Sequence, residues 1–365
     1  MFGSNNILSK VKVLQIGCGK MAKYTMRYVF DHGGVVVAGI DINPELYNKD
    51  IGLIMDGTAK GALIYPLEKL EEVIKSSTPN IAIVTTMSLL KDVADVIKRC
   101  VENGVNVITT CEEAFFPFNS NPKLAWELDA LAKNHRVTIT GCGYQDIFWG
   151  NLISDIAGST HKITSIKGMS SYNVEDYGMA LAKAHGAGIS EDEFNKTIGV
   201  VNNMSDSERK VLIDNGTFLP SYMWNTVGWL AYKLNLKVTN ISEKIVPIKC
   251  EELIHSDTLR MDIPSGAVRG MSAIVTATTE EGIILEAECV GKVYIGEEVD
   301  MNTWTVHGEP DTTLNISKPM TVELTCADIV NRIPDVINAG YGFVPTCLMG
   351  DAKYLTKPLK EYISK

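Results

Sequence analysis

The feature that most constrains this 365-residue chain is a short β-type run that ends in closely spaced small residues. The run Val11–Ile16 is followed by Gly17, Gly19 and Ala22, in G-x-G-x-x-A spacing. The first glycine allows a tight turn, the second lets a pyrophosphate approach the backbone, and the alanine lets a helix pack closely on the sheet. The spacing therefore predicts a βαβ unit that binds a dinucleotide at the N-terminus of a helix beginning at Lys20.

An acidic residue lies at the expected distance from these glycines. The run Val35–Ile40 predicts a second strand, and it ends in Asp41, where a ribose hydroxyl would be held. The negative charge of Asp41 favours NAD because it repels the 2′-phosphate of NADP. Asn43 tolerates NADP, so use of both cofactors stays open. A glycine-rich turn in another kind of α/β protein is the alternative interpretation.

The first 150 residues alternate between strand and helix patterns. The predicted strands are Val11–Ile16, Val35–Ile40, Ile81–Thr85, Asn106–Thr109 and Arg136–Thr140. The predicted helices are Lys20–Phe30, Leu67–Ser76, Ser88–Asn103 and Pro122–Asn134. This alternation predicts a doubly wound parallel sheet of the Rossmann type, covered by helices on both faces. We expect residues 1–150 to form a dinucleotide-binding domain.

The pattern changes after residue 150. A strand is predicted at Lys162–Tyr172, and a helical section follows over residues 191–237. Further strands are predicted at Ile245–His255, Ala267–Thr279, Ile283–Val293, Trp304–Val306 and Met320–Leu324. Strands without intervening helices indicate a largely antiparallel sheet. We expect residues 151–325 to form an α+β domain that binds substrate and forms a homodimer, and residues 326–365 to return to the nucleotide domain.

Composition excludes several classes of function. The net charge of −10 argues against nucleic-acid binding, which usually needs a basic face. No apolar stretch approaches the ~20 residues that span a bilayer, and the first twelve residues lack the apolar core of a signal peptide. We expect a cytoplasmic protein with no membrane contact. The eight cysteines and six histidines lack metal-ligand spacing, so we expect free thiols and no metal.

Chemically useful residues follow the predicted strands, at the edge of the sheet where ligands bind. Glu112 and Glu113 leave the fourth strand and run into the aromatic pair Phe115 and Phe116. A carboxyl group beside aromatic side chains loses hydration, which raises its pKa and suits it to proton transfer. We expect one of the two acids to be catalytic. The alternative is a helix N-terminus that favours acids because of its dipole.

The remaining candidates fall into a cofactor set and a substrate set. The expected cofactor contacts are Gly17, Cys18, Gly19, Lys20, Met21, Asp41, Asn43, Thr85, Thr86, Met87, Thr110 and Cys111. The expected substrate contacts are Tyr144, Phe148, Trp149, Tyr172, Asn173 and His185. Simpler interpretations stay open, because Ser88 alone suits a helix N-cap, aromatics pack at domain junctions, and His185 suits a loop hydrogen bond.

Several of these segments together resemble a known family. Besides the glycine motif, they are Thr-Cys-Glu-Glu-x-x-x-Pro from Thr110, Thr-Gly-Cys-Gly-Tyr-Gln-Asp from Thr140, and His-Gly-Ala-Gly-Ile-Ser-Glu-Asp-Glu-Phe from His185. They resemble the 2,4-diaminopentanoate dehydrogenases and the related native amine dehydrogenases, within the dihydrodipicolinate-reductase-like group. The His-His-x-x-Lys run of true dihydrodipicolinate reductases is missing.

The resemblance implies NAD(P)-dependent oxidative deamination of an amine or diamino acid to a ketone plus ammonia, and the reverse reductive amination. It implies that Glu112, with Glu113 as the second choice, handles the amine, and that Trp149 narrows the substrate pocket. Alternatives are an imine or carbonyl reductase of the same group, a semialdehyde dehydrogenase with Cys111 or Cys142 as nucleophile, and a non-catalytic NAD(P) sensor.

Overall fold

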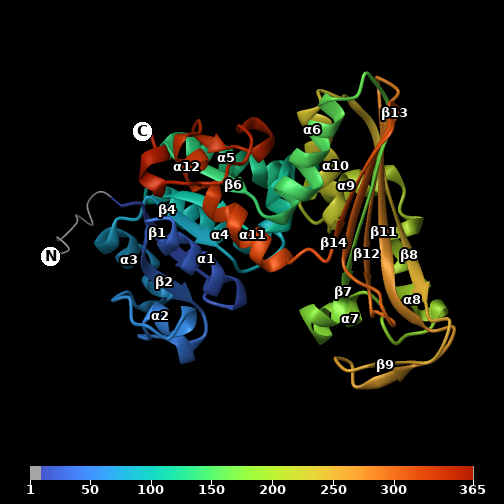
Figure 1. The fold of residues 1–365 in the computed structure, drawn as a ribbon, viewed down its shortest axis with the longest axis horizontal. Helices are drawn as coiled ribbons and strands as arrows, with labels where there is room; N and C mark the ends of the chain where they lie inside the picture. The colour runs from blue at the N-terminus through green and yellow to red at the C-terminus, as the bar shows by residue number, and fades with distance from the viewer. Residues whose placement is uncertain (1–9, 365) are drawn as a thin grey trace. The chain divides into compact units, whose positions relative to one another are not determined.

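The computed structural model describes residues 10–364, which form two compact units (Figure 1). Unit 1 contains the described residues up to Ile147 together with those from Met320 onward. Unit 2 contains Phe148–Pro319. The C-terminal part of the chain therefore belongs to the same unit as the N-terminal part.

Unit 1 is built on a parallel seven-stranded sheet with the order β15-β6-β5-β4-β1-β2-β3. Its strands are β1 Lys12–Ile16, β2 Val35–Asp41, β3 Ile64–Pro66, β4 Ile81–Val84, β5 Asn106–Thr109, β6 Thr138–Gly141 and β15 Gly342–Phe343. The chain order reverses at β1, which pairs with β2 on one side and β4 on the other. The predicted doubly wound parallel sheet is confirmed, and its reversal point marks the edge where dinucleotides bind in such sheets.

Helices cover both faces of this sheet. One apolar layer joins the sheet to α1 Lys20–Asp31, α2 Ile51–Met55, α11 Thr321–Asn331 and α12 Ile333–Asn338. The other layer joins it to α3 Leu70–Ser77, α4 Leu90–Glu102 and α5 Pro122–His135. Alternate residues of β1 point into different layers, with Val13 in the first and Leu14 in the second. Burial on both faces explains why the strands read as nearly continuous apolar runs.

Unit 2 contains a mixed, mostly antiparallel sheet with the order β14-β13-β7-β12-β11-β8. Its strands are β7 Lys162–Asn173, β8 Val238–Lys249, β11 Val268–Thr279, β12 Ile284–Lys292, β13 Met301–Glu309 and β14 Thr312–Ser317. Only the central pair β7 and β12 runs parallel. The short strands β9 Ile254–Ser256 and β10 Met261–Ile263 form a separate hairpin. The predicted α+β character is confirmed.

The helical segments of unit 2 are mostly short. They include a π-helix at Asp146–Asn151, which begins at the boundary of the units, and α6 Leu152–Gly158, α7 Met179–Ala184, α8 Glu191–Thr197, α9 Asp206–Asn215 and α10 Tyr222–Lys233. Helix α10 packs against β11 and β12, and its Trp224 and Trp229 are fully buried. Among the described residues, no helix is both long enough and apolar enough to cross a membrane.

Some predicted elements were wrong. The predicted strand Met320–Leu324 is the start of helix α11, because Cys326, Ile329 and Val330 bury one helical face in unit 1. The predicted strand Ile245–His255 is the second half of β8 followed by a turn and β9. Strands β3 and β14 were missed, because β3 has only three residues and β14 is largely polar.

Candidate active site

The glycine turn after β1 forms an open cradle. Gly17 has φ +84°, and a Cβ atom there would lie 2.7 Å from Cγ2 of Thr86. Gly19 is the N-cap of α1, and a Cβ atom there would meet nothing within 4 Å. No side chain caps the first turn of α1. The cradle therefore fits the pyrophosphate of a dinucleotide, which the helix N-terminus attracts through its N–H groups and dipole.

Asp41 ends β2 beside this cradle. Its Oδ2 atom accepts a hydrogen bond from the backbone N–H of Cys18 at 2.6 Å, and its Oδ1 atom accepts one from Asn43 at 2.8 Å. Each carboxylate oxygen can accept a second hydrogen bond. The carboxylate is thus held in a fixed orientation while it keeps acceptor capacity for a ribose hydroxyl.

The other predicted cofactor contacts differ in exposure. Lys20, Asn43, Thr86 and Met87 are exposed, and Met21, Thr85 and Thr110 are half-buried. The Cys111 thiol is fully buried and donates a hydrogen bond to the carbonyl of Ser88 at 3.1 Å. Cys111 therefore does not present its thiol at this edge of the sheet, because the side chain packs into the core instead.

The two neighbouring glutamates are in different surroundings, and both carboxylate oxygens of Glu113 accept hydrogen bonds from other segments of unit 1. Its Oε2 atom accepts a hydrogen bond from the backbone N–H of Leu90 at 2.7 Å, and its Oε1 atom accepts one from the hydroxyl of Ser120 at 2.8 Å. The side chain is buried. Glu113 thus caps the start of α4, a role for which Ser88 was the sequence candidate.

Glu112 opens a 3-10 turn, Glu112–Phe115, that directly follows β5, and it keeps part of its surface exposed. Desolvation by the surrounding protein raises the pKa of Glu112, although an interaction with the Ser88 side chain offsets part of that rise. Burial also raises the pKa of Glu113. Both shifts have the direction expected for acids beside aromatic side chains, and the Glu112 residue is half-buried whereas Glu113 is fully buried.

A close contact supports the turn that carries Glu112. Gly141 ends β6, and a Cβ atom there would collide with the backbone of Ala114 in the Glu112–Phe115 turn. Only a glycine lets the two backbones approach this closely. The end of β6 therefore fixes the position of the turn, and with it the position of the carboxyl group.

A buried polar cluster holds the C-terminal helices to the rest of unit 1. The thiol of Cys142 donates to Asp328 at 2.8 Å, and Nε of Arg332 pairs with Asp146 at 2.8 Å. Cys142, Asp146 and Asp328 bring three possible metal-ligand atoms within 4.8 Å of one another. The guanidinium of Arg332 already supplies a positive charge there, so the cluster is described as an ion-pair network rather than as a metal site.

Burial raises the pKa of both Cys111 and Cys142 well above the ordinary value of a thiol. These high pKa values argue against a nucleophilic thiolate at either cysteine.

In unit 2, two predicted substrate contacts form a pair. The hydroxyl of Tyr172, on β7, lies 2.6 Å from Nε2 of His185, and Nδ1 of His185 lies 2.9 Å from the carbonyl of Leu181. The carbonyl can only accept, so Nδ1 carries the proton and Nε2 accepts from the tyrosine. Burial lowers the pKa of His185, which favours this neutral form. The expected loop hydrogen bond of His185 is therefore present together with the contact to Tyr172.

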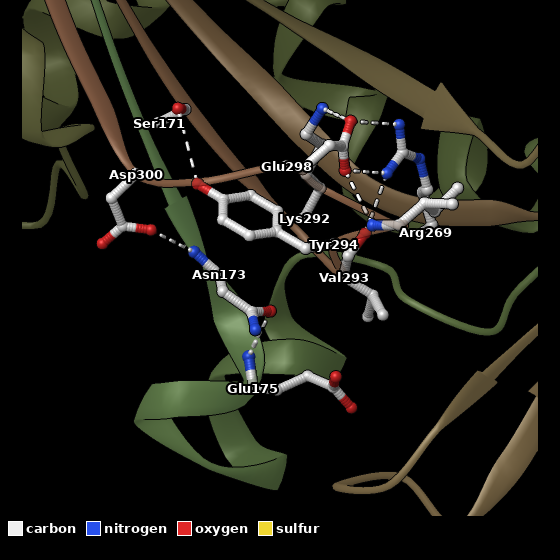
Figure 2. Close-up of polar contacts among 10 residues, drawn as sticks. Ser171, Asn173, Glu175, Arg269, Lys292, Val293, Tyr294, Glu298 and Asp300 are labelled. Carbon is white, nitrogen blue, oxygen red and sulfur yellow. Dashed lines mark hydrogen bonds and ion pairs between the residues drawn. The ribbon is translucent and has the colours of Figure 1, made fainter. Parts of the chain in front are cut away.

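Asn173, a third candidate, lies at the end of β7 in a network of polar contacts (Figure 2). Its Oδ1 atom accepts a hydrogen bond from the backbone of Glu175 at 3.2 Å, and its own N–H donates to Asp300 at 3.2 Å. The hydroxyl of Tyr294 donates to that of Ser171 at 3.4 Å in the same network. Asn173 thus caps the 3-10 turn that follows β7.

The remaining aromatic candidates lie close to the boundary between the units along the chain. Tyr144 is buried in unit 1, and its backbone N–H donates to Thr325 at 3.1 Å. Phe148 and Trp149 are half-buried and lie in the π-helix Asp146–Asn151. Single π-helical turns are frequent at functional sites.

Comparison with known proteins identifies the family of this chain. The family model for the 2,4-diaminopentanoate dehydrogenase C-terminal domain matches residues 148–358, more than half of the chain. The chain belongs to the 2,4-diaminopentanoate dehydrogenase family. The predicted family resemblance is thereby confirmed, and the chain is an oxidoreductase of this family.

Two relatives match nearly the whole chain, and a more distant structure shares its fold. The 2,4-diaminopentanoate dehydrogenase of Acetoanaerobium sticklandii is 25% identical, over 95% of this chain and 98% of the relative. The structure of an amine dehydrogenase from Mycobacterium smegmatis is 32% identical, with a TM-score of 0.82 over 95% of this chain and 98% of that one. An Agrobacterium radiobacter oxidoreductase solved with NAD+, L-tartaric acid and magnesium shares the fold, at 11% identity and a TM-score of 0.52 over 89% and 88%.

Sequence reasoning missed several residues that shape the site in this member of the 2,4-diaminopentanoate dehydrogenase family. Ser120 and Leu90 hold Glu113, and Gln15 bonds to the glycine turn from inside the sheet. Gln15 could have been noticed as a polar residue within an otherwise apolar strand. The contacts of Glu113 leave no comparable signal, because they join residues that lie 7 and 23 positions away.

Proposed function

We propose that this chain catalyses NAD(P)-dependent oxidative deamination of an amine or diamino acid to a ketone plus ammonia, together with the reverse reductive amination. The observation that carries the proposal is the different environment of two adjacent acids. Glu113 is used in capping α4, whereas Glu112 is half-buried, makes no such cap, and has a raised pKa in the turn after β5, at the ligand-binding edge of the parallel sheet. Family membership supports the same reaction class.

The cofactor is held by unit 1 in this proposal. The cradle at Gly17 and Gly19 binds the pyrophosphate, and Asp41 binds the ribose hydroxyls. The bound nicotinamide supplies the two-electron chemistry by exchanging a hydride with the carbon that bears nitrogen. Because Asp41 carries a negative charge next to the ribose site, we propose NAD as the preferred cofactor, with weaker use of NADP.

Glu112 is the proposed catalytic residue. In the deamination direction its carboxylate accepts a proton from the substrate ammonium group and passes it to solvent. The restored negative charge then stabilises the iminium cation that forms when the hydride leaves the substrate carbon. The carboxylate next takes a proton from the water that attacks the iminium carbon and delivers it to the carbinolamine nitrogen, which leaves as ammonia while the hydroxyl proton returns to the carboxylate. A raised pKa suits this role, because it makes Glu112 a stronger base than an ordinary glutamate at neutral pH.

The substrate side of the proposal uses the aromatic residues of the sequence prediction. We propose that Tyr172, Phe148 and Trp149 bind the carbon skeleton, with His185 fixing the hydroxyl of Tyr172. Tyr144 and Asn173 take supporting roles, since one is buried and the other caps a turn. We also propose that unit 2 forms a homodimer.

A substrate panel tests the function. Purified protein is assayed with NAD and NADP against amines, amino acids and diamino acids, and with NADH against ketones in the presence and absence of ammonium. We expect NADH oxidation that requires both a ketone and ammonium. Ketone reduction that does not require ammonium would instead indicate a carbonyl reductase, and cofactor binding without any turnover would indicate a sensor.

A further inference from the structure

A fully buried amide, Gln15, lies beneath the glycine turn. It occupies the middle of β1, where it is in register with Gly39 of β2 and Ile83 of β4. Its chain neighbours Leu14 and Ile16 are buried aliphatic residues. A buried amide destabilises the fold unless its N–H groups and its carbonyl oxygen are hydrogen-bonded. The hydrogen-bond partners of Gln15 therefore indicate its structural role.

Every polar atom of this amide is used near the cradle. Nε2 of Gln15 donates to the carbonyl of Gly17 at 2.9 Å and to Oγ1 of Thr85 at 3.0 Å. Its Oε1 atom accepts from the hydroxyl of Thr25, on α1, at 2.7 Å. The hydroxyl of Thr85 also donates to the carbonyl of Gly17 at 3.1 Å. The carbonyl of Gly17 therefore receives two donors, one from β1 and one from the end of β4.

The same peptide group reaches Asp41 on its other side. The backbone N–H of Cys18 belongs to the peptide plane of the Gly17 carbonyl, and it donates to Oδ2 of Asp41 at 2.6 Å. Because a peptide group is planar, fixing the carbonyl also fixes the direction of the N–H. By bonding to the Gly17 carbonyl, Gln15 thus helps to fix both the glycine turn and the N–H group that holds the Asp41 carboxylate.

We propose that Gln15 is a positioning residue for the dinucleotide, which holds the Gly17–Cys18 peptide so that the cradle and the Asp41 carboxylate are already arranged for NAD. It acts through the peptide and does not touch the cofactor. The proposal rests on the dinucleotide binding proposed above. It implies that Gln15 contributes to the choice of cofactor, because a loosely held Asp41 discriminates less against a 2′-phosphate.

The test uses cofactor binding rather than turnover. In Gln15→Met the side chain keeps its length but loses every hydrogen bond of the amide. Binding of NADH and NADPH is measured by fluorescence titration of the protein without substrate. We expect the Kd for NADH to rise about tenfold, which is the scale of one or two net hydrogen bonds. We expect a smaller rise for NADPH, so that the ratio of the two Kd values moves towards one. At saturating NAD, kcat stays close to the wild-type value while the KM for NAD rises.

A buried amide in unit 2 provides the matched control. Asn302, on β13, donates to the carbonyl of Phe148 at 2.9 Å and accepts from Nε1 of Trp304 at 2.9 Å. Asn302→Leu should lower the melting temperature but leave both Kd values unchanged. A second variant, Thr25→Val, removes the hydroxyl that donates to Oε1 of Gln15 and that also lies 3.2 Å from the carbonyl of Ala22 within α1, and it should raise the Kd for NADH about threefold. It decides the question if Gln15→Met does not fold.

Each outcome has a distinct meaning. An unchanged Kd for NADH in Gln15→Met, or in Thr25→Val where only that variant folds, overturns the role of Gln15. An equal rise in the two Kd values also overturns it, because a merely structural defect would have that effect. If the wild-type protein binds neither nucleotide, the proposed function itself fails. If the wild type binds NADH and the variants bind it equally well, only the role of Gln15 fails.

Discussion

Replacing Glu112 by glutamine tests the central assignment. Glutamine keeps the shape of the side chain, but it cannot accept a proton from the substrate and carries no charge to stabilise an iminium cation. Glu112 lies in the turn directly after β5, where desolvation raises its pKa. A reduced dielectric of this kind also strengthens the attraction between its carboxylate and a nearby cation.

The size of the effect follows from that electrostatic attraction. Two opposite charges about 4 Å apart attract by about 4 kcal/mol at an effective dielectric constant of about 20. Since each ~1.4 kcal/mol in the barrier changes the rate tenfold, complete loss would slow the reaction by about 10³-fold. Glu112 is only half-buried, so solvent screens part of this attraction. We therefore expect kcat for Glu112→Gln to fall by ~10²-fold or more, within the usual range for a general base.

The assay is steady-state amine oxidation at saturating NAD as a function of pH. Because the folded protein raises the pKa of Glu112, the active carboxylate is lost as pH falls through a value above that of an ordinary glutamate. The wild-type kcat/KM should fall on this acid limb, and the limb should be missing in Glu112→Gln. Binding of NADH should be unchanged, since the side chain is assigned to the substrate.

The neighbouring acid is the matched comparison. In Glu113→Gln the cap on Leu90 loses its charge at the start of α4, so we expect the melting temperature to fall by a few degrees. Its kcat should stay within about threefold of the wild-type value. A Glu112→Gln variant that keeps wild-type kcat and the acid limb would refute the reasoning, as would a Glu113→Gln variant that folds normally and loses turnover instead.

Three further changes follow from the geometry of unit 1. Asp41→Ser should lower the preference for NAD over NADP about tenfold, measured as the ratio of kcat/KM values, and an unchanged ratio would contradict its assignment to the ribose. Arg332→Met should lower the free energy of unfolding in urea by about 3–5 kcal/mol, because it removes the buried positive charge that pairs with the buried Asp146 carboxylate. Adding Asp146→Asn should recover part of that loss. Gly141→Ala should lower the free energy of unfolding by about 1–3 kcal/mol, because the added methyl group displaces the backbone of Ala114 in the Glu112–Phe115 turn. The same displacement should lower kcat, and an unchanged kcat would contradict the inference that Gly141 fixes the position of this turn.

Much of the fold could be predicted from local patterns. The strands and helices predicted in the first 140 residues are all present, and their ends lie within a few residues of the predicted ones, although the short elements α2 and β3 were not predicted. Met320–Leu324 was misassigned because a five-residue segment that contains the β-branched Thr321 and Val322 fits a strand as well as a helix. Its packing against distant parts of unit 1 decides in favour of the helix α11.

The sequence alone determined the parallel sheet, the glycine turn with its acid, and the family, because these depend on residue types at short, fixed spacings. It also narrowed the candidate base to two adjacent glutamates. Only the tertiary structure separated them, because Glu113 is bonded by Leu90 and Ser120, which fold onto it from elsewhere in the chain. The place of Gln15 beneath the cradle was likewise decided by residues that come together only when strands and helices pack.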